Sequence, residues 1–333
     1  MKTGIFGAGS IGCHVGGMLA AKGRHPVLVG RPAMAQRLAR GMVLTSHDGR
    51  QVLAPPGSFT FDLRANALAD CECVLVCVKS GDTSAAGRIL SQVTRPDALI
   101  VSLQNGISNA QVLRQAMPGR RVLAAMVGFN VAQIGDNRFH RGTEGEIVIE
   151  DGEGALRLAT ALTLAGVPAM VRRDIEAVQW GKLLLNLNNA VNALSGLPLK
   201  RQLSDRGWRK VLALSITEAL AVIQAAGIVP ARLGKVAPGL IPPILQLPDW
   251  LFTRIAGSML RMDEDARSSM AEDLERGREP EIDWLNGEIV RLGESRAVPT
   301  PVNSALCEMV HELFAHKPPA HPSAQQVLAR LEA

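Results

Sequence analysis

The sequence predicts an α/β fold, in which a doubly wound, mostly parallel sheet is followed by a second, all-α domain. Up to about residue 173, short β-rich runs alternate with helix-like stretches, as in strands joined by crossover helices. From residue 174 onward, the apolar spacing becomes long and helical. We therefore expect domains at 1–173 and 174–333, and a chain of 333 residues with 47% hydrophobic content can build both cores.

Five β-rich runs define the expected sheet: TGIFGA, HPVLVG, CECVLVCVK, DALIVSLQ and RVLAAMVG. Two other stretches have a different pattern. MVLTSHDGRQVLA predicts a hairpin that turns at Asp48 and Gly49, and FHRGTEGEIVIE predicts a second hairpin. A helix and a strand within EGALRLATALTLAGVPAMVRR are expected to close the first domain.

The second half of the chain predicts helices over residues 174–195, 207–226, about 250–276, 279–296 and 303–316. The segment 230–250 contains prolines that make a continuous helix unfavourable there. We interpret that segment either as a lid or as a long connection.

The glycine-rich turn GAGSIG follows the first strand and opens the first helix. Gly7 permits a tight turn, Gly9 lets a pyrophosphate approach the backbone, and Gly12 lets the helix pack on the strand. The helix start, at Ser10 and Ile11, would offer N–H groups to the phosphates. The pattern predicts a Rossmann-type dinucleotide site, and the alternative is a purely structural glycine turn.

The end of the second strand, VLVGR, discriminates between nicotinamide cofactors. A site for NAD usually has Asp or Glu there, whereas this chain has Arg31. A guanidinium can bind a 2′-phosphate with two hydrogen bonds, so NADP(H) is favoured. Arg37 and Arg40 are possible helpers, and the alternative is a solvated surface arginine.

The stretch WGKLLLNLNNAVNAL has one lysine in an otherwise uncharged helical pattern. Lys182, Asn186 and Asn189 are spaced so that they share one helix face. Partial burial would lower the pKa of the ammonium toward neutrality, which suits a proton donor. The alternative is a lysine that reaches solvent at the domain junction, with asparagines capping nearby turns.

An acidic stretch, RSSMAEDLERGREPEIDWLNGEIV, follows later in the chain. Ser269 and Asp273 are one helical turn apart, and Glu281 begins a new helix just after Pro280. By itself, this stretch is typical of a solvated pair of acidic helices.

Composition excludes several classes of protein. The net charge is +5, but the basic residues are scattered and aromatic residues make up only 3%, so we expect no nucleic-acid partner. No apolar run is long enough to predict a membrane span or a leader. The five cysteines lack the spacing of a metal site and are expected to be free thiols in the cytoplasm. We expect a monomer or a homodimer.

Taken together, these stretches resemble the ketopantoate reductase family, the 2-dehydropantoate 2-reductases, over nearly the whole chain. GAGSIG, CVKS, LQNGI, W-G-K-x-x-x-N, SSM-x-x-D and EID-x-x-N-G occur in the family's order and approximate spacing. The resemblance implies NADPH-dependent reduction of the ketone of 2-dehydropantoate to (R)-pantoate. That reaction is a step toward pantothenate and coenzyme A.

The resemblance also implies roles for individual residues. Lys182 matches the family's catalytic lysine, which stabilises the substrate oxygen and donates the proton. Glu281 matches the acidic partner that positions this lysine and the substrate. Lys79 and Asn105 match residues at the nicotinamide half of the cofactor site, and Asn105 is also expected to contact substrate.

On the substrate side, Ser269 matches a contact to the carboxylate, and Asn186 matches a hydrogen-bonding residue. Two family asparagines are replaced in this chain, by Ala190 and Ala266. Asn189 is expected to substitute for the first of them. These changes leave the hydride chemistry expected and the distal groups of the substrate open.

Two alternatives remain at this stage. One is an NADPH-dependent reductase of another 2-oxo acid, or a related β-hydroxyacid or polyol-phosphate dehydrogenase. The other is a sensor or scaffold protein that binds NADPH without turnover.

Overall fold

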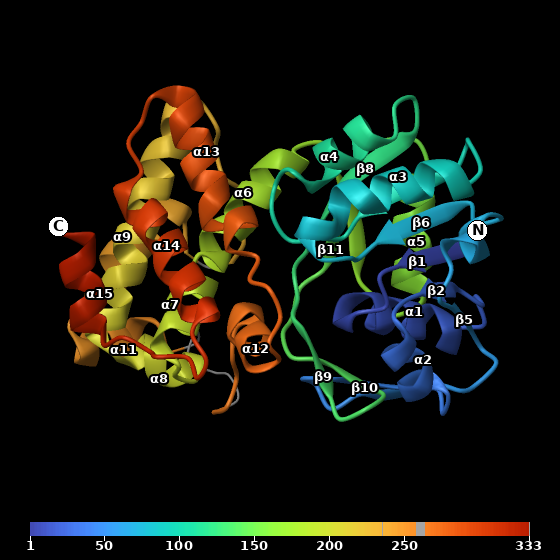
Figure 1. The fold of residues 1–333 in the computed structure, drawn as a ribbon, viewed down its shortest axis with the longest axis horizontal. Helices are drawn as coiled ribbons and strands as arrows, with labels where there is room; N and C mark the ends of the chain where they lie inside the picture. Colours follow the sequence, from blue (N-terminus) through green and yellow to red (C-terminus); the bar gives the residue numbers. More distant parts are fainter. Residues whose placement is uncertain (235, 258–263, 333) are drawn as a thin grey trace. The chain divides into compact units, whose positions relative to one another are not determined.

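The computed structural model describes residues 1–234, 236–257 and 264–332 (Figure 1). The chain separates into two compact units, residues 1–175 and 176–333. The division lies two residues beyond the boundary that the change of periodicity predicts.

The first unit is built on an eight-stranded sheet with the order β12-β11-β8-β7-β6-β1-β2-β5. Strands β11 and β12 run opposite to the others, which are mutually parallel. This confirms the predicted doubly wound sheet. The strands are β1 (Thr3–Phe6), β2 (Val27–Val29), β5 (Thr60–Asp62), β6 (Cys73–Val76), β7 (Leu99–Ser102), β8 (Arg121–Val127), β11 (Ile147–Glu150) and β12 (Ala169–Arg172).

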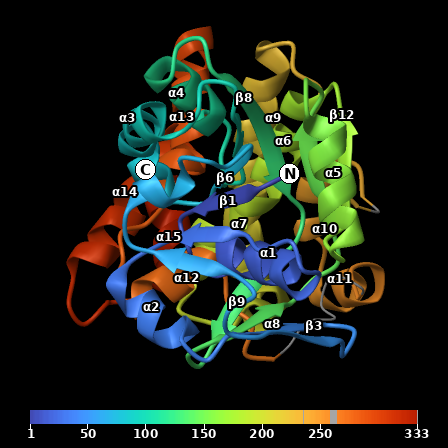
Figure 2. The same cartoon turned by 90° about the vertical axis from the view of Figure 1, so that its right-hand side faces the viewer.

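Helices cover both faces of this sheet, as the alternation of its side chains requires. In β6, Cys73 and Leu75 belong to one hydrophobic cluster, and Val74 and Val76 belong to another. Figure 2 shows α1 and α5 on one side of the sheet and α3 and α4 on the other. The helices are α1 (Ser10–Ala21), α2 (Pro32–Leu38), α3 (Thr83–Val93), α4 (Asn109–Ala116) and α5 (Ala155–Leu164), with 3-10 turns η1 (Ala65–Leu68) and η2 (Ser80–Asp82).

A second, four-stranded sheet has the order β4-β3-β10-β9, with β3 at Met42–Ser46, β4 at Gln51–Ala54, β9 at Val131–Ile134 and β10 at Arg138–Arg141. The predicted hairpin at Asp48 and Gly49 is confirmed, since β3 and β4 pair antiparallel and Gly49 has φ +80°.

The second predicted hairpin, FHRGTEGEIVIE, is wrong. Its first strand, β10, pairs with β9 across a turn at Gly135 (φ +64°), whereas β11 pairs with β8 in the larger sheet. The chain therefore reverses one strand earlier than predicted. Three consecutive residues of β11, Ile147, Val148 and Ile149, are buried, as expected for a strand covered on both faces.

The second unit is all-α within the described residues, as predicted. Its helices are α6 (Ile175–Asn186), α7 (Asn188–Ser195), α8 (Leu199–Ser204), α9 (Arg206–Ala225), α10 (Ile241–Leu245), α11 (Asp249–Ile255), α12 (Ser269–Glu275), α13 (Asn286–Arg296), α14 (Pro301–Ala315) and α15 (Ala324–Leu331), with 3-10 turns η3 (Pro238–Leu240) and η4 (Ile282–Trp284).

Three of the predicted helices differ from the observed ones. The helix at 174–195 is interrupted at Leu187, where the side chain of Asn188 accepts a hydrogen bond from Gln202 at 3.1 Å. The helix at 250–276 is two helices, α11 and α12, because the hydroxyl of Ser268 caps a new start; residues 258–263 lie outside the described residues. The helix expected from 279 begins only at Asn286.

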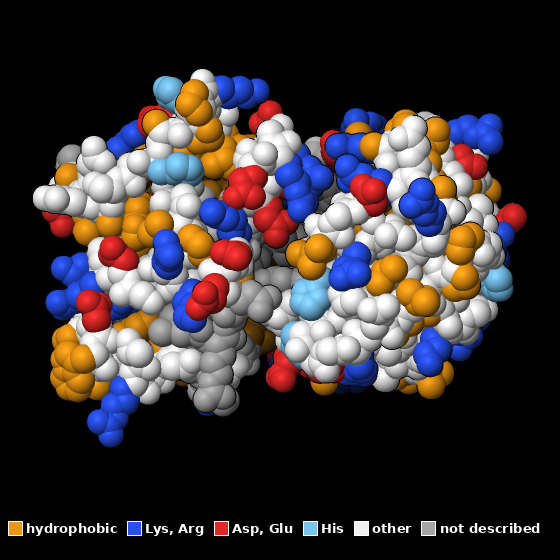
Figure 3. Space-filling view, turned by 90° about the horizontal axis from the view of Figure 1, so that it is seen from below, with side chains coloured by type: hydrophobic (Ala, Val, Ile, Leu, Met, Phe, Trp, Pro, Cys, Tyr) orange, Lys and Arg blue, Asp and Glu red, His pale blue; other side chains and the backbone are white. Residues whose placement is uncertain are grey.

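The surface gives two further observations. On the face shown in Figure 3, basic and acidic side chains are interspersed over the described parts of the chain. In those same parts, no helix has both the length and the hydropathy needed to cross a bilayer.

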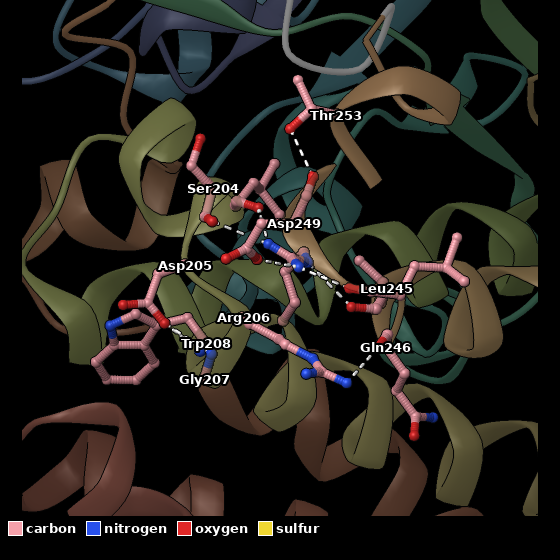
Figure 4. Close-up of polar contacts among 12 residues, drawn as sticks. Ser204, Asp205, Arg206, Gly207, Trp208, Leu245, Gln246, Asp249 and Thr253 are labelled. Carbon is pink, nitrogen blue, oxygen red and sulfur yellow. Dashed lines mark hydrogen bonds and ion pairs between the residues drawn. The ribbon is translucent and has the colours of Figure 1, made fainter. Parts of the chain in front are cut away.

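A buried arginine anchors the end of the proline-rich segment 230–250. Arg209 of α9 is fully buried, and its guanidinium donates to the carbonyls of Leu245 (3.0 Å) and Leu247 (2.9 Å) and to Asp249 Oδ1 (2.7 Å) (Figure 4). It also lies 4.2 Å from the ring centre of Phe252. The remaining acceptors are the carbonyls of Leu203 and Ser204. The end of this segment is thus fastened to α9. For its described residues, 230–234 and 236–250, this favours a packed connection over a lid.

Arg209→Leu should lower the free energy of unfolding of the helical unit by roughly 3–5 kcal/mol, because it leaves buried carbonyls and Asp249 without their donor. Arg206→Leu is the matched control, since Arg206 is exposed and makes one 3.3 Å bond to the Gln246 carbonyl. It should cost less than about 0.5 kcal/mol. Urea unfolding measures both, and hydrogen exchange over residues 241–255 should accelerate only in Arg209→Leu. Equal losses in the two variants would contradict the anchoring role.

Candidate functional site

The glycine-rich turn shows why three glycines stand at these positions. Gly7 has φ +109°, and a Cβ there would lie 2.6 Å from the nitrogen of Val78. A Cβ on Gly12 would lie 2.3 Å from the carbonyl oxygen of Gly7. The fold itself therefore requires glycine at these two positions.

Gly9 is different, because a Cβ there would meet none of the described heavy atoms within 4 Å, and its backbone is extended. The open space beside it is what an approaching pyrophosphate needs. Helix α1 begins at the next residue, Ser10, and among the described residues no side chain caps this end and no acid stands in its first turn. Ser10 and Ile11 are half-buried, and the start of the helix carries a partial positive charge. These residues fit the phosphates of a dinucleotide.

Arg31 lies at the same end of the strands as the glycine turn. Strands β1 and β2 are parallel neighbours, and Arg31 follows β2 as the residue before α2. Its side chain is 84% exposed, and its Nη2 lies 4.0 Å from the carboxylate of Asp82. Of the two predicted helpers, Arg37 donates to Gln133 at 3.5 Å. The position of Arg31 fits a role in binding a 2′-phosphate.

Lys79 and Asn105 follow β6 and β7, which are also parallel neighbours. The structure brings the two segments together, because the hydroxyl of Ser80 donates to the carbonyl of Asn105 at 3.2 Å. The side chain of Asn109 donates to the same carbonyl at 2.5 Å. The backbone of Asn105 is therefore held in place beside the residue that follows Lys79.

A buried network extends these contacts. The hydroxyl of Thr83 donates to Asn109 Oδ1 at 2.7 Å and accepts from Gln104 Nε2 at 2.7 Å. Gln104 in turn accepts from the hydroxyl of Ser102 at 3.0 Å. All of these side chains are buried, so their hydrogen bonds fix one arrangement of the two segments. Sequence reasoning missed this network, although its signal is visible as short polar residues one helical turn apart after each strand.

In the second unit, Lys182 and Asn186 lie four residues apart on α6. Asn186 is buried and Lys182 is half-buried. Burial lowers the pKa of the Lys182 ammonium below the usual lysine range. A lysine with this pKa shift, on a face that it shares with an asparagine, can donate a proton more readily than a solvated lysine can.

Asn189 and Ser269, which are far apart in the sequence, are in contact. Asn189 Nδ2 donates to the hydroxyl of Ser269 at 3.3 Å, so α7 and the start of α12 lie side by side. Asn192, which sequence reasoning did not select, supports this contact, because its Oδ1 accepts from the nitrogen of Ser268 at 2.9 Å. The hydroxyl of Ser268 donates to the carbonyl of Asn189 at 3.3 Å. Ser269 is exposed and its neighbours are fixed.

The acidic residues of this stretch separate into two environments. Asp273 is buried and lies 3.7 Å from the guanidinium of Arg278, so it serves the packing of α12. Glu281 is half-buried and stands immediately before η4. The cofactor-binding candidates thus all lie in the first unit, and Lys182, Asn186, Asn189, Ser269 and Glu281 all lie in the second.

A doubly wound sheet with a glycine turn at the carboxyl end of a central strand, together with a helical unit that carries a half-buried lysine, fits a two-domain oxidoreductase. Comparison with known proteins agrees with this class. The family model "Ketopantoate reductase PanE/ApbA" matches residues 3–154, and its C-terminal counterpart matches residues 174–314. The chain belongs to the ketopantoate reductase family and is an oxidoreductase that acts on CH–OH groups.

Individual relatives cover nearly the whole chain. The structure of a PanE/ApbA family ketopantoate reductase from Ralstonia eutropha JMP134 is 33% identical, with a TM-score of 0.80, over 94% of this chain and 98% of that one. A 2-dehydropantoate 2-reductase of Halobacterium salinarum is 27% identical over 93% of this chain and 98% of its own length. D-mandelate dehydrogenase, solved with NADH and anilino(oxo)acetate, shares the fold at 20% identity, with a TM-score of 0.77, over 94% of this chain and 98% of its own.

Gly9→Ala should leave the thermal unfolding temperature within about 1 °C, because the added Cβ meets open space, yet weaken dinucleotide binding at least roughly tenfold. Gly12→Ala is the contrasting variant, since its Cβ would collide with the Gly7 carbonyl and lower stability. Differential scanning fluorimetry and calorimetric titration with NADPH measure the two effects. Tight NADPH binding by Gly9→Ala would exclude the pyrophosphate site.

Proposed function

We propose that the protein uses NADPH to reduce the ketone of 2-dehydropantoate to (R)-pantoate, in the biosynthesis of pantothenate and coenzyme A. The family match supports the reaction, and relatives at 27% identity are named 2-dehydropantoate 2-reductase. The single observation that carries the proposal is the place of Lys182, half-buried on α6 on the face that it shares with Asn186, where burial lowers the pKa of its ammonium. We also propose that the protein acts in the cytoplasm as a monomer or a homodimer.

Lys182 is the proton donor in this proposal. When bound, NADPH supplies the hydride that attacks the carbonyl carbon. The ammonium stabilises the negative charge that develops on the carbonyl oxygen and then protonates it. Glu281 positions this lysine and the substrate, and Asn105 and Lys79 contact the nicotinamide half of the cofactor.

The substrate end is assigned to Asn186, Asn189 and Ser269. The amide of Asn189 and the hydroxyl of Ser269 are already held together, so they can contact the same ligand group. Ala190, which replaces a family asparagine, is fully buried in α7, so its side chain is turned away from solvent. Asn189, the adjacent residue, is partly exposed and supplies the missing amide.

A second candidate is a reductase of another 2-oxo acid. Ala266 stands where the family has an asparagine, and here its carbonyl accepts from the nitrogen of Leu199 at 2.8 Å. The side chain that reaches the substrate's distal groups is therefore shortened at this position. The carboxylate and ketone contacts stay the same, so only the distal part of the substrate differs between the two candidates.

Steady-state NADPH oxidation with purified protein separates these candidates. The substrates are 2-dehydropantoate, 2-oxoisovalerate and an aryl 2-oxo acid, each over a range of concentrations. The proposal expects 2-dehydropantoate to give the highest kcat/KM. A higher kcat/KM for another acid would favour the second candidate. If none of the acids is turned over, the reductase proposal fails, and a protein that binds the cofactor without catalysis is favoured.

Lys182→Ala should lower kcat by a factor on the order of 10² to 10⁴ and leave the NADPH dissociation constant within about twofold. In the unmutated protein, kcat should fall as pH rises, because the neutral amine above its pKa cannot donate a proton. Burial lowers that pKa, so the fall should begin below the usual lysine range. Lys200→Ala, which removes a half-buried lysine paired with Glu264, is the control. An unchanged kcat in Lys182→Ala would exclude the assigned role.

A further inference from the structure

We propose that Asp82 limits the preference of this protein for NADPH over NADH. Its carboxylate pairs with Arg31, and it repels the 2′-phosphate that Arg31 binds. This inference rests on the proposed use of NADPH and assigns a specificity role to a residue of the same site.

The ion pair spans the carboxyl end of β1, at the glycine turn. Strand β1 lies between β2 and β6, with Phe6 paired to Val29 on one side and to Val76 on the other. Arg31 follows β2 and Asp82 follows β6, so their 4.0 Å contact passes over the end of β1, where Gly7 begins the turn. A dinucleotide bound at the turn must therefore meet both side chains.

The backbone holds Asp82 in this position. Its nitrogen donates to the carbonyl of Lys79 at 2.9 Å, and the next residue, Thr83, is buried with its hydroxyl in the polar network. The side chain itself is 59% exposed, so the carboxylate can rotate, while the backbone contacts fix the position of the Cα. Arg31 is similarly limited, because Pro32 follows it and the preceding Gly30 donates to the Asp62 carbonyl at 3.2 Å.

The other carboxylate near the end of β2 has a cation of its own. Asp62 of β5, the neighbouring strand, accepts from the nitrogen of Arg64 at 2.8 Å and pairs with its guanidinium at 3.5 Å. These contacts lower the pKa of Asp62 and keep it ionised. Asp82 is thus the carboxylate that the structure pairs with Arg31.

The two cofactors differ in charge at this point. NADPH brings a phosphate with a charge near −2 beside a carboxylate, whereas NADH brings only a neutral ribose hydroxyl. Both groups are exposed, so the repulsion is partly screened and should weaken NADPH binding by roughly three- to tenfold. An exchange of partners by Arg31, from carboxylate to phosphate, accompanies NADPH binding alone.

Calorimetric titration of the full-length protein tests this inference. The ligands are NADPH, NADH, adenosine 2′,5′-bisphosphate and 5′-AMP, and the last two isolate the adenosine end. Asp82→Asn should lower the dissociation constants of the two ligands with a 2′-phosphate by roughly three- to tenfold. The dissociation constants of the other two should stay within about twofold. The gain should shrink between about 20 mM and 500 mM salt.

Asp70→Asn is the matched control. Asp70 is an exposed carboxylate of the same unit that pairs with Lys2 at 3.5 Å, before the start of β1 and β6 and hence at the opposite edge of the sheet. This variant removes the same charge and should change no affinity by more than about twofold. A gain in Asp70→Asn equal to that of Asp82→Asn would show a general charge effect and overturn the inference.

Arg31→Ala separates failure of this inference from failure of the proposed cofactor. If Arg31→Ala weakens the 2′-phosphate ligands alone while Asp82→Asn changes none of them, the inference is wrong and NADPH stands. If Arg31→Ala weakens the binding of NADPH and NADH equally, Arg31 does not bind the 2′-phosphate, and the inference fails together with that role. Turnover of 2-dehydropantoate is measured independently and decides the reaction.

Discussion

The close contact between Gly12 and the carbonyl of Gly7 is the constraint on which the first unit depends. With no Cβ at residue 12, helix α1 begins directly against the end of β1, so the positive end of the helix lies at the edge of the sheet. The positive φ of Gly7 then turns the chain past Val78, the residue that leads out of β6. Because β1 pairs in parallel with β2 and β6, and β6 with β7, the segments that follow β2, β6 and β7 lie at the same end of the sheet as this turn. The residues assigned to the cofactor belong to those segments.

The second unit shows two ways of burying a positive charge. Arg209 is surrounded by carbonyls and a carboxylate, so hydrogen bonds offset the desolvation of its guanidinium. Burial of Lys182, in contrast, lowers the pKa of its ammonium. The first arrangement stabilises packing, whereas the second leaves a proton that is easier to transfer. The contrast separates a cation that stabilises packing from the lysine that we propose as the proton donor.

The sequence was most informative where a local pattern has one physical solution. The alternation of strands and helices and the turn GAGSIG predicted the sheet and its glycine edge, because few other structures suit them. The hairpin prediction for FHRGTEGEIVIE failed because β10 and β11 join different sheets, a choice made by long-range pairing. The break at Leu187 and the contact between Asn189 and Ser269 depend on packing between helices, which no local pattern encodes. The roles of the site residues remain predictions.

The buried hydroxyl of Thr83 connects the two ends of the proposed nucleotide site. On one side it bonds to Asn109, which holds the carbonyl of Asn105, the residue proposed for the nicotinamide half. On the other, it belongs to the first residue of α3, directly after Asp82, whose carboxylate pairs with Arg31, the residue proposed for the adenosine half. A buried network of this kind is costly to distort, so it holds the two segments at fixed positions relative to each other. The distance between the residues that we propose for the two halves of the dinucleotide is therefore set by the protein itself, which would reduce the ordering that cofactor binding must supply.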